Sequence, residues 1–175
     1  MGQKKFSPLS IAPYMFNPKL LGHIWHNKYW YIFTSLLAGV VVTISCAPFN
    51  IWPFYIIALA AIFFIIERQA SYKKVFYYSF LFYGAHNISA HAHWIYSSFT
   101  GFAVDPILAS ITSILFCLIL SLLPTAAIVL YKWLTRESSN KYIKILAFSS
   151  SIVVVEWLRT FSPLTLPSSF ANTHI

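Results

Sequence analysis

Two charged residues in an otherwise apolar part of the chain, Glu156 and Arg159, are the first candidates for chemistry. A membrane helix entered near Lys144 would carry Glu156 about 17 Å along its axis, past the middle of a hydrocarbon layer about 30 Å thick. Residues three apart share a helix face, so pairing can offset part of the cost of burying these charges. Two interpretations stay open: a functional site inside the membrane, or an ion pair that only locks helices together.

Histidines on one earlier apolar segment are the second candidate. His86 and His93 share a helix face but lie about 10.5 Å apart along the axis, too far to grip one metal ion, and His91 points in another direction. The other apolar segments contain no histidine and only Glu156 as an interior carboxylate. We therefore predict no metal site and no cofactor, and expect these histidines to line a polar helix contact or a cavity at headgroup level. A histidine-lined metal or haem protein remains an alternative.

The sequence contains no recognisable motif for nucleophilic catalysis. Cys46 and Cys117 both lie inside apolar runs without a neighbouring CxxC or metal-type spacing. The serines and threonines form no nucleophile elbow, P-loop or SxxK arrangement. The residues alone therefore predict no catalytic group.

The composition identifies the class of protein that must position these candidates. Of the 175 residues, 58% are hydrophobic and 9% are charged, whereas about a quarter of a soluble globular chain is charged. The net charge of +8 is dispersed between apolar runs, which argues against nucleic acid as a partner. We predict an all-α, polytopic helical membrane protein whose partner is the phospholipid bilayer.

Five apolar segments are expected to cross the bilayer, at about residues 29–47, 51–66, 75–96, 107–133 and 145–163. Residues 1–28 form a cytoplasmic or interfacial lead-in, and residues 164–175 an extracytoplasmic tail. Polar loops are predicted at 67–74, which includes Glu67, at 97–106 and at 132–144. The third segment is the most polar and is expected to face inward.

The basic residues predict the orientation of these segments. Eleven of the twelve lysines and arginines precede the first segment or lie in the 67–74 and 132–144 loops, and only Arg159 falls on the other side. The positive-inside rule then places the N-terminus in the cytoplasm and the C-terminus outside.

The fourth segment carries a stripe of small residues and one proline. Four-residue spacing puts the stripe on one helix face, where it would let a second helix approach closely and would give Cys117 a packing role; its members are Ala109, Ser113, Cys117, Ser121 and Thr125. The same segment is long enough to need a tilt, or the kink that Pro124 permits.

Three short motifs resemble apolipoprotein N-acyltransferases, and together they cover about residues 29–167. The first combines Leu37-Ala38-Gly39 with Ala47-Pro48-Phe49-Asn50-Ile51-Trp52-Pro53. The second runs from Phe80-Leu81-Phe82-Tyr83-Gly84 to His93-Trp94-Ile95-Tyr96-Ser97, and the third is Glu156-Trp157-Leu158-Arg159. They occur in the order of the family. After the third motif only Pro167 fits the family pattern.

The resemblance implies a membrane bundle that serves a nitrilase-like domain outside the cytoplasm. In the family, a Glu-Lys-Cys triad transfers an acyl chain from phospholipid to the N-terminal amine of a diacylated lipoprotein, through a thioester on the cysteine. No triad residue can be assigned in this chain, so the resemblance implies a truncated or split acyltransferase that is inactive alone, with a separately encoded nitrilase-like domain as a partner.

The resemblance also implies a multi-pass protein of a bacterial inner membrane. Its site residues would be the Glu156 and Arg159 pair, with His86, His93, Trp94 and Tyr96 at a lipid entrance or in helix packing. A non-enzymatic helical bundle that binds lipid or a partner protein is the alternative, because the small-residue stripe suits it equally well.

Overall fold

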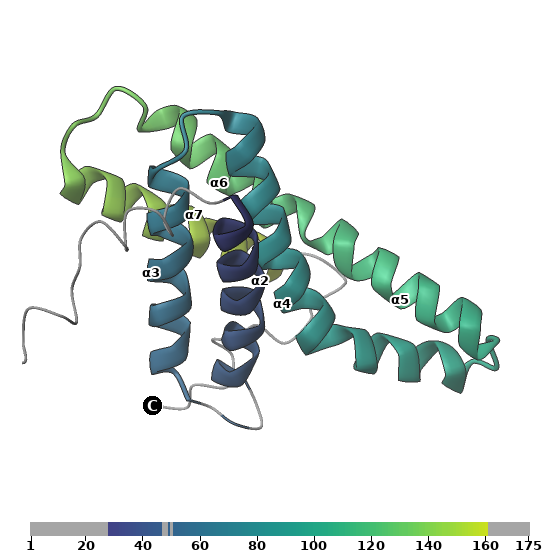
Figure 1. The fold of residues 1–175 in the computed structure, drawn as a ribbon. Helices are drawn as coiled ribbons and strands as arrows, with labels where there is room; N and C mark the ends of the chain where they lie inside the picture. Colours follow the sequence, from purple (N-terminus) through teal and green to yellow (C-terminus); the bar gives the residue numbers. More distant parts are fainter. Residues whose placement is uncertain (1–27, 47–48, 50, 161–175) are drawn as a thin grey trace, which may run out of the picture.

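The computed structural model of the protein describes residues 28–46, 49 and 51–160, with the side chains of residues 159 and 160 left out. These residues form helices joined by short loops, and no strand occurs among them (Figure 1). The helices are α2 (Lys28–Ser45), α3 (Pro53–Glu67), α4 (Tyr72–Gly101), α5 (Pro106–Leu120), α6 (Leu122–Leu134) and α7 (Lys141–Thr160). The fold is therefore all-α, as predicted. The predicted lead-in before Lys28 and the tail at 164–175 lie outside the described residues.

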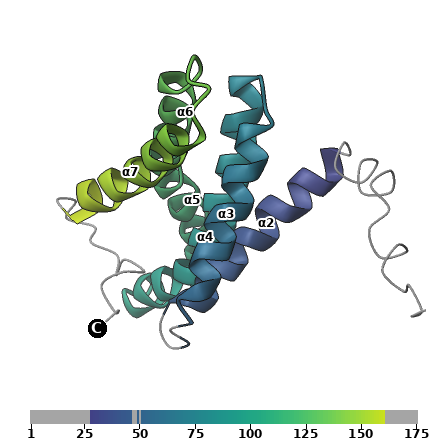
Figure 2. The same ribbon diagram turned by 90° about the vertical axis from the view of Figure 1, so that its left-hand side faces the viewer.

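Helices α2 and α4 run side by side in the same direction. The rings of Tyr31 and Tyr78 lie 5.7 Å apart near their N-termini, and the hydroxyls of Thr43 and Ser89 lie 2.5 Å apart farther along. Helix α3 lies between α2 and α4 in sequence and runs in the opposite direction. Its C-terminal residue Glu67 therefore lies at the end of the bundle where α4 begins (Figures 1 and 2). This end of the molecule, where α3 and α6 end and α4 and α7 begin, is called the Glu67 end below.

The second half of α4 leaves the bundle and forms an arm with α5. Figure 1 shows α4 changing direction beyond its contact with α2 and running out to a tip, from which α5 returns. Ser89 bonds back to the carbonyls of Ala85 and His86 at 2.7 and 3.1 Å, and back-bonding of this kind bends helices.

The turn at the tip of the arm is shorter than the sequence predicts. Helix α4 continues to Gly101, through most of the predicted loop at 97–106, and the hydroxyls of Ser97, Ser98 and Thr100 bond to carbonyls of their own helix at 2.9–3.1 Å. Asp105 then caps α5 by accepting from the N–H groups of its first turn at 2.9 and 3.2 Å, and Pro106 suits its first position.

The predicted fourth segment is two helices that meet at Ser121. Pro124 lacks the N–H that would bond the carbonyl of Leu120, and its ring crowds that carbonyl. Helix α5 accordingly ends at Leu120 and α6 begins at Leu122, an interruption of the helix at the place where Pro124 permits a kink. In both ribbon views α6 continues the course of α5 (Figures 1 and 2).

An aromatic cluster attaches α7 to the bundle. The ring of Phe148 lies 5.0 Å from that of Phe63 on α3 and 5.4 Å from that of Tyr131 on α6, edge to face in both cases. Such pairs are worth about 0.5–1.5 kcal/mol beyond their area. The core continues from this cluster between the helices; its buried members are Ala38, Val42, Ala58, Ile62, Ile66, Val75, Phe82, Ile128, Tyr131, Phe148 and Ile152.

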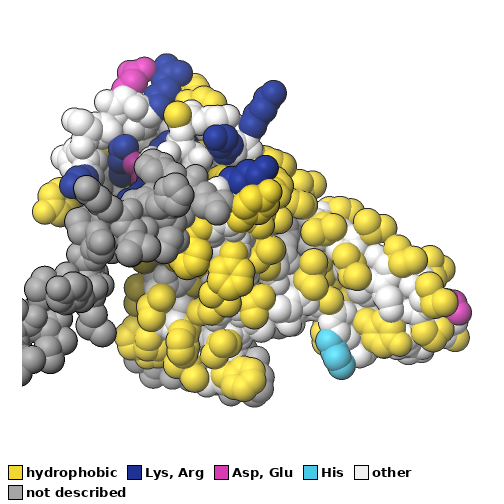
Figure 3. All heavy atoms as spheres, in the orientation of Figure 1, with side chains coloured by type: hydrophobic (Ala, Val, Ile, Leu, Met, Phe, Trp, Pro, Cys, Tyr) yellow, Lys and Arg dark blue, Asp and Glu magenta, His cyan; other side chains and the backbone are white. Residues whose placement is uncertain are grey.

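Large apolar side chains also cover much of the outer surface. They follow the outer faces of α2, α3 and α5. On α5, for example, Ile107 is 73% and Ile119 is 62% exposed. Figure 3 shows these apolar side chains over the bundle and the arm. Within the described residues, Lys28–Ser45 and Pro106–Leu134 are long and apolar enough to cross a membrane, and Pro53–Glu67 is a shorter apolar helix.

Candidate functional site

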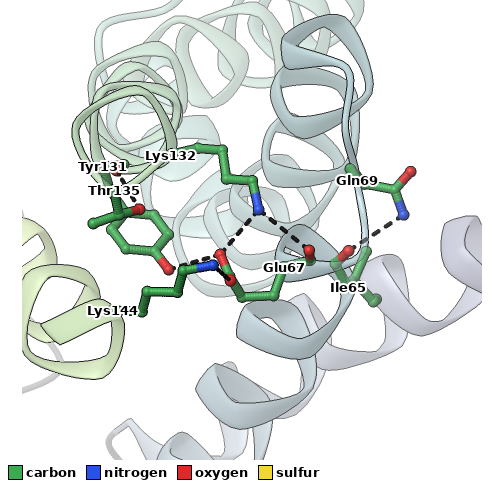
Figure 4. Close-up of polar contacts among 7 residues, drawn as sticks. All are labelled: Ile65, Glu67, Gln69, Tyr131, Lys132, Thr135 and Lys144. Atoms are coloured by element: carbon green, nitrogen blue, oxygen red, sulfur yellow. Dashed lines mark hydrogen bonds and ion pairs between the residues drawn. The ribbon is translucent and has the colours of Figure 1, made fainter. Parts of the chain in front are cut away.

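Glu67 is the centre of a polar cluster that joins three helices. Its carboxylate accepts hydrogen bonds from the Tyr131 hydroxyl at 2.9 Å, from the Lys132 ammonium at 3.0 Å and from the Lys144 ammonium at 2.7 Å (Figure 4). Lys132 also donates to the Glu67 carbonyl at 3.2 Å, where α3 ends. One carboxylate thus fixes α6 and the first turn of α7 to the end of α3.

The lysines hold Glu67 in its ionised form. Burial is the largest single effect on this carboxyl and would raise its pKa, but hydrogen bonds from Lys144, Lys132 and Tyr131 together outweigh it and lower the pKa below the ordinary value of 4.5. The side chains of Glu67, Lys132 and Lys144 are only 19%, 14% and 23% exposed. A partly buried carboxylate with two ammonium partners is therefore charged at neutral pH.

A cavity of about 310 Å³ opens beside this cluster. Its wall comes from the α3–α4 connection, from α6 and from α7, and its lining residues are Glu67, Arg68, Gln69, Ala70, Tyr72, Lys132, Arg136 and Lys144. Four of these are basic and one is acidic. Figure 3 shows the basic side chains gathered at this end of the molecule, away from the arm.

A second, uncharged contact lies where α4 meets α5 and α6. The Asn87 amide donates to the Ser121 hydroxyl at 2.9 Å, and the Cys117 thiol donates to the Asn87 carbonyl at 3.3 Å. The predicted small-residue stripe is confirmed, because every member is at most 1% exposed: Ala109, Ser113, Cys117, Ser121 and Thr125. Cys117 has the predicted packing role.

Helices α2 and α4 approach each other closely at Gly39 on α2. A Cβ built there would lie 2.9 Å from the Cβ of Ala85 and 3.1 Å from the backbone N of His86, and it would also collide with the Phe82 carbonyl oxygen. Only glycine lets α2 and α4 cross at this distance. Gly39 belongs to the first sequence motif and Phe82 to the second, so this crossing brings two of the three motifs together.

The histidines and aromatic residues predicted for a site lie along α4 in different environments. His86 and His91 are buried with their rings 5.8 Å apart. His93 and Trp94 are exposed on the arm, and Tyr96 is half-buried. His86 and His93 differ because α4 leaves the bundle between them. Among the residues that the structure describes, no three His, Cys, Asp or Glu side chains gather as metal ligands.

Glu156 lies on α7, about 17 Å from Ile145 along the helix axis. It is half-buried, with Oε2 inside the protein. The helix includes Arg159, but the side chain of Arg159 lies outside the described residues. The pairing of these two residues therefore stays a prediction.

A comparison with models of protein families identifies the chain. Residues 38–175 match the model described as the apolipoprotein N-acyltransferase N-terminal domain. The chain belongs to the apolipoprotein N-acyltransferase family. The predicted resemblance is thereby confirmed for the N-terminal part of the family. A comparison with curated proteins gives no match.

The Glu67 cluster of this acyltransferase-family chain was not recognised from the sequence. The sequence predicts a polar loop that begins at Glu67, and it uses Lys132 and Lys144 only to predict the orientation of the segments. One signal was present, because Glu67 is among only four acidic residues and stands between an apolar run and a basic loop. Its partners are 65 and 77 residues away, and no local pattern identifies partners at that distance.

Proposed function

We propose that this chain is a multi-pass membrane domain of a bacterial inner membrane that supports acyl transfer from phospholipid to the N-terminus of a diacylated lipoprotein. The match of residues 38–175 to the N-terminal domain of the family carries this proposal. The bundle supplies the lipid-embedded scaffold, and the reaction takes place at the end opposite Glu67.

The outer surface supports a bilayer as the surroundings. Apolar side chains with exposed fractions of 45–73% follow the outer side of α5 and the start of α6: Ile107, Leu108, Ile111, Ile114, Leu115, Ile119 and Leu122. A soluble protein rarely exposes so long an apolar surface. The hydroxyls of Ser110 and Ser113 on α5 donate to carbonyls of the same helix at 2.8 and 2.7 Å, as suits a lipid environment.

The charge distribution supports the orientation. Seven basic residues border the Glu67 end, at Arg68, Lys73, Lys74, Lys132, Arg136, Lys141 and Lys144. Asp105 is the acid at the tip of the arm. Under the positive-inside rule the Glu67 end faces the cytoplasm, and the arm with Trp94 and Tyr96 reaches the outer interface, where the donor phospholipid enters.

The thioester chemistry belongs to a nitrilase-like Glu-Lys-Cys domain that acts together with this bundle, on the same or a companion chain. The Cys117 thiol is 0% exposed and donates to a backbone carbonyl, so it is inaccessible to a phospholipid ester. Glu156 and Arg159 then serve as an intramembrane pair that holds α7 in place.

Joint expression with a nitrilase-like domain tests this function. The tagged chain is purified in mild detergent with and without that domain, and acylation of a diacylated lipoprotein peptide is measured by mass spectrometry. We expect co-purification and acyl transfer only when both are present. A thioester formed on Cys46 or Cys117 by residues 1–175 alone, or a complete lack of association, would contradict the proposal.

A further inference from the structure

The cavity at the Glu67 end carries more positive charge than its own carboxylate balances. Lys132 and Lys144 share the single carboxylate of Glu67 at 3.0 and 2.7 Å. Arg68 and Arg136 add two guanidinium groups to the same lining. Glu137, the acid bonded to Arg136, is 83% exposed and outside that lining. The lining alone therefore holds a surplus of three positive charges.

The four basic groups have different freedom to bind a ligand. Lys132 and Lys144 are held in place by hydrogen bonds to Glu67, so their ammonium groups are positive charges at fixed positions in the cavity wall. Arg68 and Arg136 are exposed. The guanidinium of Arg68 lies 3.9 Å over the ring of Phe64, and Arg136 donates from Nε and Nη2 to Glu137 at 3.1 and 3.0 Å, in a solvent-exposed pair that a phosphate can replace. Guanidinium groups bind phosphate oxygens through paired hydrogen bonds, and a fixed ammonium adds charge.

The surroundings of the cavity place it at the level of lipid headgroups. Tyr72 lines it, and large apolar or aromatic side chains of the adjoining helix ends are exposed next to it in sequence, with Phe64 at 39%, Trp133 at 51% and Leu134 at 65%. Aromatic side chains beside basic residues are typical of the membrane interface.

We propose that this cavity binds the phosphate group of an anionic phospholipid from the cytoplasmic leaflet. The inference rests on the membrane insertion and orientation proposed above. A phosphodiester that enters from the bilayer meets Arg68 and Arg136 first and is held over Lys132 and Lys144, while its acyl chains stay beside the exposed ends of α3 and α6. Because the site is at the end opposite the acyl-transfer reaction, the bound lipid anchors the bundle and is not the acyl donor.

Lipid titration of the purified full chain in neutral detergent tests this site. Native mass spectrometry gives apparent Kd values for dioleoylphosphatidylglycerol and for dioleoylphosphatidylcholine. We expect the anionic lipid to bind about tenfold more tightly, and the R68Q/R136Q variant to lose about tenfold for that lipid, since two charge-assisted hydrogen bonds are removed. These arginines lie outside the Glu67 ion cluster, and thermal unfolding verifies that the variant folds.

The K73Q/K74Q variant is the matched control, because it removes the same charge from exposed residues of the same end that do not line the cavity. It should change the Kd by less than about twofold. An equal loss in both variants, equal binding of the two lipids, or displacement of the lipid by millimolar inorganic phosphate would overturn the inference. Carbonate extraction separately reports membrane insertion, so a failed lipid site can be told apart from a failed membrane assignment.

Discussion

The Glu67 end and the arm of α4 and α5 are stabilised in different ways. At the Glu67 end, one carboxylate and two ammonium groups join α3, α6 and α7 across 65 and 77 residues of sequence. In the arm, the helices are neighbours in sequence, and α5 packs through small buried side chains such as Ala109 and Ser113 while its outer face is apolar. The ionic cluster fixes distant helix ends, whereas the arm is held by the packing of small side chains and presents apolar side chains on its outer face.

The crossing of α2 and α4 lies between these regions and should be the most sensitive point of the fold. Gly39→Val would place carbon atoms within 2.9 Å of Ala85 and 3.1 Å of the His86 nitrogen, so the helices must separate. We expect a loss of about 3 kcal/mol in the free energy of unfolding, measured by denaturant titration in detergent micelles.

Gly101→Ala is the control for this substitution, since no atom lies within 4 Å of the added Cβ at the tip of the arm. It should change stability by less than about 0.5 kcal/mol. Equal effects at the two glycines would mean that α2 and α4 do not cross closely.

Removing the charge of Glu67 should have the next largest effect. Glu67→Gln leaves Lys132 and Lys144 partly buried without a carboxylate, and we expect a loss of about 2 kcal/mol in the same unfolding measurement. Asp105→Asn makes the same change at the arm, where asparagine caps a helix as well as aspartate does, so its effect should be near zero. A similar loss in both variants would remove the distinction between the two regions.

The same cluster predicts a pH dependence of stability. The pKa of Glu67 is lowered in the folded protein by Lys144, Lys132 and Tyr131 against the opposing effect of burial. Its contribution is therefore fully present above the ordinary pKa of 4.5 and is lost as the pH falls through the lowered folded value. The midpoint temperature of thermal unfolding should fall more steeply over this acidic range for the wild type than for Glu67→Gln. Parallel dependence of the two midpoints on pH would show that Glu67 is not paired.

A smaller effect is expected where the arm joins the bundle. Ser121→Ala removes the hydroxyl that accepts from Asn87 at 2.9 Å, and hydrogen bonds between membrane helices are worth about 0.6 kcal/mol. Ser110→Ala, on the exposed side of α5 and bonded only within its helix at 2.8 Å, should be neutral in the same measurement. If Ser110→Ala costs as much as Ser121→Ala, the contact with Asn87 contributes nothing.

Much of this architecture could be predicted from local sequence patterns. Apolar runs predict helices, four-residue spacing predicts the buried stripe through Cys117, and Pro124 permits an irregularity in the fourth segment, where α5 ends and α6 begins. These features depend on side chains a few residues apart, and the structure confirms each of them.

What the sequence did not reveal depends on distant contacts or on how polar residues bond. The sequence predicts a loop at 97–106, yet α4 continues to Gly101, and the serines and threonine of this segment are bonded within the helix. His86 and His93 share a helix face in sequence, but only His86 is buried because α4 leaves the bundle. The contacts of Glu67 with Lys132 and Lys144 join three helices and therefore exist only in the assembled fold.

Cysteine accessibility in intact cells tests the orientation of the two regions most directly. Gly101→Cys at the tip of the arm and Ser138→Cys between α6 and α7 are compared in a background with alanine at Cys46 and Cys117. A membrane-impermeant maleimide applied from outside should label position 101 in intact cells and position 138 only after the inner membrane is opened. Labelling of both positions from the same side would contradict a bundle that crosses the membrane between the Glu67 end and the arm.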